Sequence, residues 1–251
     1  MYNMLFETQQ YVSSLVFNQF KPPNVWWSPD LETLNCAGHI LTMSDFRNGL
    51  QKAFEKLWQL YDCISNGKRF ASSLPDVLKD NLLDDTRGYS FLSHGPYTKE
   101  PHEFLTYLIR NSPWRMATVN ADNHISWNVP AIKDFLRVTG EFNELLSILT
   151  FILPTISTRV TQYLDHKFQN DGRPRNLVAM LKEMVLLTTY HKMTNQTGYD
   201  QWTPAFLPPK LKKVMVEYLA GGLRFCEAFL AEQAYGSEAA TQYSRYAIHH
   251  T

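Results

Sequence analysis

Positive charge is concentrated in one stretch of a chain that is neutral as a whole. The 251 residues include 24 Lys and Arg against 24 Asp and Glu. Between residues 158 and 213 the basic residues are Arg159, Lys167, Arg173, Arg175, Lys182, Lys192, Lys210, Lys212 and Lys213, and the acidic ones are Asp165, Asp171, Glu183 and Asp200. A phosphate-contacting surface needs such a local excess, whereas the balanced total argues neither for nor against a nucleic-acid partner.

Two polar loops in this stretch carry the residue types that bind a nucleic-acid backbone. The first, GRPRN at 172–176, places two guanidinium groups on a stiff turn before a predicted helix. A guanidinium suits phosphate because its fork binds two oxygens at once, and the backbone donors of a helix start add to the attraction. The second loop, at 190–202, follows the same helix. The predicted nucleic-acid-binding residues are Arg159, Lys167, Arg173, Arg175, His191 and Lys192 at phosphates, with Tyr199 and Trp202 for stacking.

Motifs for known catalytic chemistry are missing from the sequence. It contains no GxxxxGK[ST] loop for nucleotide phosphates, no GxSxG elbow and no HExxH zinc motif. We therefore expect no catalytic residue, metal site or cofactor. An enzymatic alternative stays open, a divergent, recombinase-like DNA-processing enzyme in which Asp165, His191 and Arg159 converge in one pocket. The HxxR spacing of tyrosine recombinases is absent after His191.

The cysteines and the hydropathy pattern bear on the compartment. Cys36, Cys63 and Cys226 lie far apart and form no CxxC pair, so zinc-finger spacing is absent. We expect reduced, mostly buried thiols in an intracellular protein. No run approaches the ~20 apolar residues that span a bilayer, and the first residues lack the pattern of a signal peptide. We therefore expect no membrane partner.

Apolar residues recur at helical spacing through most of the chain, which predicts a mainly α fold. Helices are predicted at about 44–65, 101–109, 128–153, 157–169, 175–191, 209–231 and 237–248. Short β-prone runs on either side of turn residues predict one small β-hairpin at about 115–127. The predicted architecture is a multi-helix globular array into which this hairpin is inserted. Gly221-Gly222 predicts a kink or a close backbone approach within 209–231.

Two regions are predicted. Residues 1–43 would form an N-terminal helix and an arm rich in Trp and Pro, and residues 44–251 a single helical domain. Within the arm, Trp26 and Trp27 are expected to anchor the N-terminal segment by burial, with a stacking platform as the alternative.

Several phrases of the sequence together resemble a known family. They are FRNGLQKAF (46–54), TRGYSFLSHGP (86–96), ADNHISWNVPAI (121–132), STRVTQYLDHKFQNDGRPRN (157–176), YHKMTNQTGYDQWTPAFLPP (190–209) and EYLAGGLR (217–224). The combination resembles the helical region that precedes the motor in fungal RecQ-type, telomere-linked helicase-like proteins. The resemblance spans about residues 44–246 and contains no catalytic motif.

The resemblance implies a nuclear protein connected with DNA and with an ATP-dependent helicase motor. The motor motifs themselves are absent, so we expect a non-catalytic accessory domain that contacts DNA or a motor, as a fragment or a standalone copy. The alternative is a protein–protein interaction module with no nucleic-acid role. That alternative predicts an exposed apolar patch, at Trp26 and Trp27 and around Pro208-Pro209.

Overall fold

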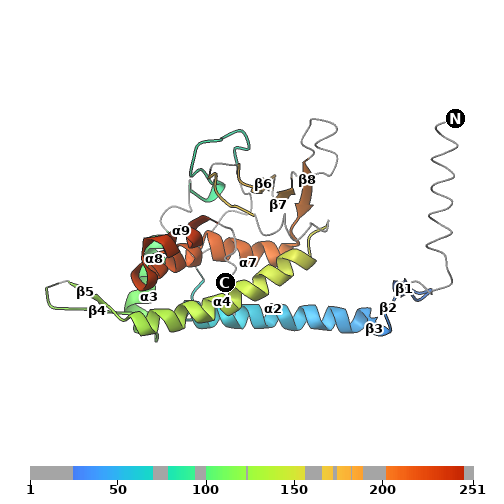
Figure 1. The fold of residues 1–251 in the computed structure, drawn as a ribbon, viewed down its shortest axis with the longest axis horizontal. Coiled ribbons are helices and arrows are strands. Elements are labelled where there is room, and N and C mark those ends of the chain that lie inside the picture. The colour runs from blue at the N-terminus through green and yellow to red at the C-terminus, as the bar shows by residue number, and fades with distance from the viewer. Residues whose placement is uncertain are drawn as a thin grey trace. The chain divides into compact units, whose positions relative to one another are not determined.

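The structure is a computed structural model that describes residues 25–69, 79–93, 100–122, 124–155, 166–171, 174–181, 183–188 and 202–245. The chain divides into two compact units, Met1–Glu55 and Lys56–Thr251. The division falls inside the helix α2, Met43–Ser65 (Figure 1). The predicted domain boundary after residue 43 stays a prediction.

The described part of the first unit is an antiparallel three-stranded sheet followed by the start of α2. Its strands are β1 Val25–Trp27, β2 Thr33–Cys36 and β3 His39–Thr42, paired in the order β1-β2-β3. Ala37 and Gly38 join β2 to β3 with φ of 50° and 88°, as a two-residue hairpin turn requires. The Thr42 hydroxyl oxygen accepts a hydrogen bond from the Asp45 amide at 3.0 Å and so caps α2.

The second unit contains the remaining helices and two further sheets. Its elements are the end of α2, α3 Glu100–Asn111, β4 Ala117–Val119, β5 Ile125–Trp127, α4 Val129–Ile152, β6 Leu177–Met180, β7 Glu183–Thr188, β8 Thr203–Phe206, α7 Pro209–Leu219, α8 Leu223–Tyr235 and α9 Ser237–Arg245, with a short 3-10 turn at Phe91–Ser93. β4 pairs with β5, and β6, β7 and β8 form an antiparallel sheet in that order. Among the described helices none is both long and apolar enough to cross a bilayer.

Helix α8 lies at the centre of the helical packing. It contacts α3, α4, α7 and α9, and Figure 1 shows α7 and α8 following one another with α4 beneath them. Leu223, Cys226 and Leu230 of α8 are fully buried. Nearby, the ring of Phe142 lies 6.0 Å from that of Tyr61 and 5.5 Å from that of Tyr218. These aromatic contacts join α2, α4 and α7 into one core.

The predicted helix at 209–231 is two helices, separated at Gly221 and Gly222. Gly222 has a φ of 96°, and a Cβ there would lie 2.5 Å from the Cα of Pro101 at the start of α3. A glycine is therefore required twice over, for its backbone angle and for the close approach of α3. The prediction of a close backbone approach at this pair is confirmed.

The prediction of a mainly α fold with one hairpin is wrong. Beside the helices, the described residues form eight strands in three small antiparallel sheets, so the fold is mixed α/β. The helix predicted at 175–191 is replaced by β6 and β7, which turn at Leu181 with a φ of 60°. Both strands are short continuous apolar runs, and periodicity does not distinguish such runs from buried helix. The sheet at 25–42 was not predicted either.

Other predicted elements are confirmed. The hairpin at 115–127 is β4 and β5, and the helices at 44–65, 101–109 and 128–153 are α2, α3 and α4. Asn128 caps α4, because its side-chain oxygen accepts a hydrogen bond from the Ala131 amide at 3.4 Å. Of the helix predicted at 157–169, residues 166–169 are not helical and the rest lies outside the described residues.

Replacing Gly222 with Ala is expected to destabilise the second unit by at least about 2 kcal/mol, because backbone strain and the clash with Pro101 add together. Urea denaturation measures the loss. Gly67→Ala is the matched control, since Gly67 also has a positive φ, of 74°, but has no atom within 4 Å of a Cβ. Equal losses in the two variants would contradict a role for the Pro101 contact.

Candidate functional site

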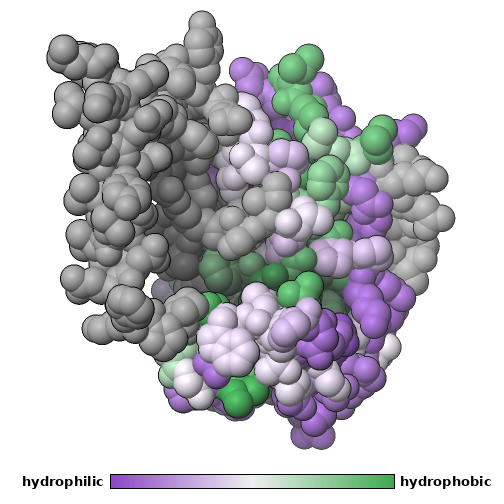
Figure 2. Space-filling model, turned by 90° about the vertical axis from the view of Figure 1, so that its right-hand side faces the viewer, coloured by the Kyte–Doolittle hydropathy of each residue, from purple (hydrophilic) through white to green (hydrophobic). Residues whose placement is uncertain are grey.

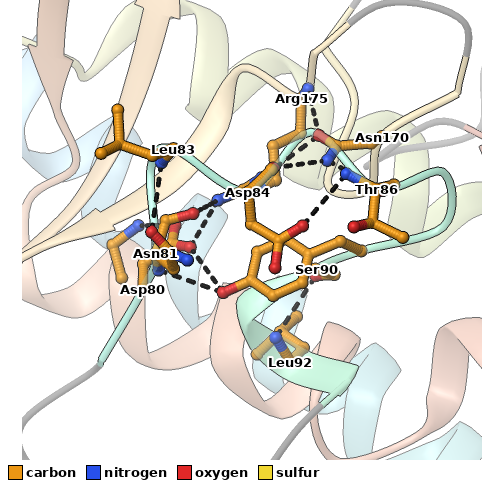
Figure 3. Close-up of polar contacts among 11 residues, drawn as sticks. Asp80, Asn81, Leu83, Asp84, Thr86, Ser90, Leu92, Asn170 and Arg175 are labelled. Carbon is orange, nitrogen blue, oxygen red and sulfur yellow. Dashed lines mark hydrogen bonds and ion pairs between the residues drawn. The ribbon is translucent and has the colours of Figure 1, made fainter.

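Arg175, predicted to contact phosphate, lies inside the second unit and is neutralised there (Figure 3). The residue is 3% exposed. Its Nη2 lies 2.5 Å from Oδ1 of Asp80, and the side chain of that acid is fully buried too. Nη2 also donates to the Asn81 carbonyl at 2.9 Å, and Nη1 donates to the Asp84 carbonyl at 3.1 Å. The guanidinium lies 4.4 Å from the ring centre of Tyr89.

Asn170 completes this cluster and ties two distant segments together. Its Nδ2 donates to the carbonyls of Asp84 at 2.8 Å and Thr86 at 3.1 Å, and its Oδ1 accepts from the Arg175 amide at 3.0 Å. The second oxygen of Asp80 accepts from the Ala179 amide of β6 at 3.0 Å. The cluster therefore fastens the loop at 80–89 to the segment that leads into β6.

Three of the predicted nucleic-acid contacts, Lys167, Arg175 and Trp202, lie among the described residues, and two of them are buried. Arg175 and Lys167 are 3% and 9% exposed, whereas Trp202 is 49% exposed. We therefore do not carry Arg175 and Lys167 forward as phosphate contacts, because burial keeps both from an external polyanion. Five predicted residues lie outside the described residues, namely Arg159, Arg173, His191, Lys192 and Tyr199.

A second buried polar cluster, which sequence reasoning missed, surrounds Glu227 of α8. This residue is 0% exposed. The Tyr218 hydroxyl of α7 donates to its Oε2 at 2.9 Å, and Nη1 of Arg224 donates to the same oxygen at 3.3 Å. Nδ2 of Asn143 on α4 donates to the other oxygen at 3.2 Å. Three helices thus converge on one carboxyl group.

Burial dominates the acid–base properties of this cluster. It raises the pKa of Glu227 to about 7, and the neighbouring Arg224 guanidinium and the hydrogen bonds from Tyr218, Arg224 and Asn143 limit the rise. Burial also raises the pKa of the Tyr218 hydroxyl and of the Cys226 thiol well above their usual ranges. The Cys226 thiol is thus an inert core group, as expected for this position.

A carboxyl group that titrates near neutrality is the kind of group that general acid–base catalysis uses. Catalysis also requires that substrate reach the group, and no part of Glu227 is exposed. An adjoining pair, in which the Tyr61 hydroxyl donates to Glu217 at 3.2 Å, is likewise buried. Together these contacts form an internal network that joins α2, α4, α7 and α8, and its role is structural.

Other site predictions have mixed outcomes. Cys36 and Cys63 are exposed, so the expectation of mostly buried thiols holds only for Cys226. Over the described ranges no three His, Cys, Asp or Glu side chains gather as metal ligands would. Asp165 of the enzymatic alternative lies outside the described residues, as do His191 and Arg159.

Apolar side chains are exposed on the sheet of the first unit. Trp26 and Trp27 are 47% and 46% exposed, so neither is a core residue, and the N-terminal segment that they are predicted to anchor lies outside the described residues. Val25, Ile40 and Leu41 are exposed as well. Figure 2 shows apolar side chains reaching the surface among hydrophilic ones on the face that it draws. Isolated surface apolar residues are ordinary, whereas several on one small sheet form an exposed apolar patch.

The pKa of Glu227 predicts how stability changes with pH. The folded state binds the proton more tightly than the unfolded state, so this group's contribution is complete below about pH 4.5 and is lost as pH rises through about 7. In Glu227→Gln this dependence disappears. Between pH 5 and pH 8 the free energy of unfolding of the wild type should therefore fall by about 3 kcal/mol relative to that of the variant.

Urea unfolding at a series of pH values measures this difference. Glu232→Gln is the matched control, because Glu232 is on the same helix but exposed, and it should follow the wild type. A Glu227→Gln variant that runs parallel to the wild type at every pH would contradict the assignment.

Comparison of the chain with protein-family models, with curated proteins and with solved structures finds no match.

Proposed function

We propose that this chain is a non-catalytic interaction module that binds a protein partner through one face of its N-terminal sheet. The observation that carries the proposal is the exposure of apolar side chains on β1 and β3, with the half-buried Leu34 of β2 between them. The contacts inside the second unit support the non-catalytic part, because Glu227, whose pKa lies near neutrality, is fully buried there.

The strand register decides which face of the sheet is the binding face. Trp27, Leu34 and Leu41 lie directly opposite one another across the three strands, and Val25 shares their face because side chains alternate along a strand. We call these four residues the apolar face. On the opposite face Trp26 lies across from Asn35, whose polar side chain interrupts the apolar surface.

The composition of the apolar face favours a protein partner over a nucleic acid. It carries no Lys or Arg among its four residues, so it offers nothing to neutralise phosphates. Exposed tryptophan and leucine side chains are the kind that form the buried centre of a protein interface. The resemblance to fungal RecQ-type proteins supports a helicase motor domain as the partner, and hence a nuclear, accessory role.

Contact with DNA is a second candidate function, favoured by the surroundings of Trp202. This side chain is 49% exposed just before β8. Lys210 and Lys213 of α7 are exposed as well. An exposed aromatic ring with lysines on the adjoining helix is the combination that binds single strands by stacking and charge.

Alanine substitution within the sheet tests the first proposal. Trp27→Ala should weaken binding to a purified RecQ-type motor domain at least tenfold, which is about 1.4 kcal/mol, because a central interface tryptophan is lost. Trp26→Ala is the matched control, since its side chain is equally exposed on the opposite face and its loss should leave the affinity within about twofold. Biolayer interferometry measures both. If the motor does not bind, or if the two variants weaken it equally, the proposed face is wrong.

The DNA candidate has its own test. Trp202→Ala should lower the affinity for a fluorescein-labelled single-stranded oligonucleotide about tenfold in anisotropy titrations, because one stacked base is worth about 1–3 kcal/mol. Trp27→Ala serves here as the control and should bind DNA like the wild type. An affinity that does not respond to either Trp202→Ala or salt concentration would remove DNA as a partner.

A further inference from the structure

We propose that α9 is a releasable cover over the buried Arg224–Glu227 pair, and that protonation of Glu227 keeps it closed. Helices α8 and α9 form a hairpin whose joint is a single residue, Gly236. It has a φ of 95°, and its amide donates to the Glu232 carbonyl at 2.9 Å. A joint of one glycine gives the second helix of such a hairpin a simple hinge.

Tyr243 of α9 closes the outer side of the charged pair. Its ring centre lies 5.7 Å from the Arg224 guanidinium, which donates on its other side to Glu227 and to the Tyr218 hydroxyl. Arg224 is 2% exposed and Glu227 is not exposed. The charges of both residues act on the Tyr243 hydroxyl, which therefore lies close to them. Withdrawing α9 would bring water to the pair.

Helix α9 packs along α8, but it offers little apolar surface of its own. Its sequence, SEAATQYSR, is mostly polar. Besides Tyr243, the apolar side chains that it offers are the half-buried Ala239 and Ala240. Helices with so little buried apolar surface are among the first parts of a protein to open.

The direction of the effect follows from the proton. Tyr243 of α9 lies against Arg224, the ion-pair partner of Glu227, so opening α9 would admit water to the pair and lower the pKa of Glu227 toward its ordinary value. The closed form therefore binds a proton more tightly than the open form. A pH that rises through neutrality favours the open form, and a falling pH favours the closed form.

The charged and titratable groups around Glu227 come from its own helix and from the helices packed against it. On its own helix Arg224 and the Cys226 thiol face it, α7 contributes the Tyr218 hydroxyl and α9 the Tyr243 hydroxyl. Helix α4 contributes the neutral Asn143. On α3, which also packs on α8, the ring of His102 contacts Phe225 at 4.9 Å.

Hydrogen exchange of the full chain, followed by mass spectrometry, tests the proposal. After correction for intrinsic exchange rates, the opening equilibrium of residues 237–245 should rise up to about tenfold between pH 6 and pH 8 in the wild type. Glu227→Gln should remove this rise, and Glu232→Gln should retain it. Protection of residues 142–149 in α4 should not fall in parallel, which separates opening of α9 from global unfolding.

A second pair of variants keeps the test decisive if Glu227→Gln does not fold. Tyr243→Ala removes the cover, so residues 237–245 should exchange quickly at both pH values and the tenfold ratio should fall to about one. Tyr243→Phe keeps the ring and should keep the ratio. A wild-type ratio of one, or an unchanged ratio in Tyr243→Ala, would overturn the proposal.

Discussion

The packing of the second unit depends on one constraint, which is that each buried charge must have partners. A guanidinium or carboxylate removed from water costs several kcal/mol unless partners satisfy it. The two internal arginines meet this requirement in the same way, Arg175 with Asp80 and Arg224 with Glu227. Each pair also takes hydrogen bonds from other segments, so the positions of those segments are fixed by a demand that apolar packing alone does not make.

The two clusters differ in what they hold. Around Arg175 the additional partners are mostly backbone carbonyls of the loop at 80–89, and carbonyl oxygens do not titrate. Around Glu227 the partners are side chains of α4, α7 and α8, and the carboxyl group itself titrates near neutrality. The second cluster therefore responds to pH near neutrality.

This use of charge explains why a count of basic residues is a poor guide to a nucleic-acid surface here. Arg175 belongs to the basic stretch between residues 158 and 213, yet its partner Asp80 lies 95 residues away along the chain. Asn143 and Glu227 are 84 residues apart. Pairings at such separations leave no local pattern, so of these contacts only the i,i+3 pair Arg224–Glu227 could be predicted from spacing. By contrast, α2 and α4 are long and strongly periodic, and their positions followed from the sequence.

The small sheet of the first unit was not predicted although its sequence holds a local signal. Gly38 is a residue type that favours a hairpin turn, but the neighbouring tryptophans and prolines favoured the prediction of an irregular arm. A sheet of three short strands has little stability of its own unless one face is covered. Its apolar face consists of side chains that gain free energy when water is removed, at about 25 cal/mol per Å². The same exposure that makes the sheet marginal alone therefore favours its association with a partner, which would stabilise the strands as it binds.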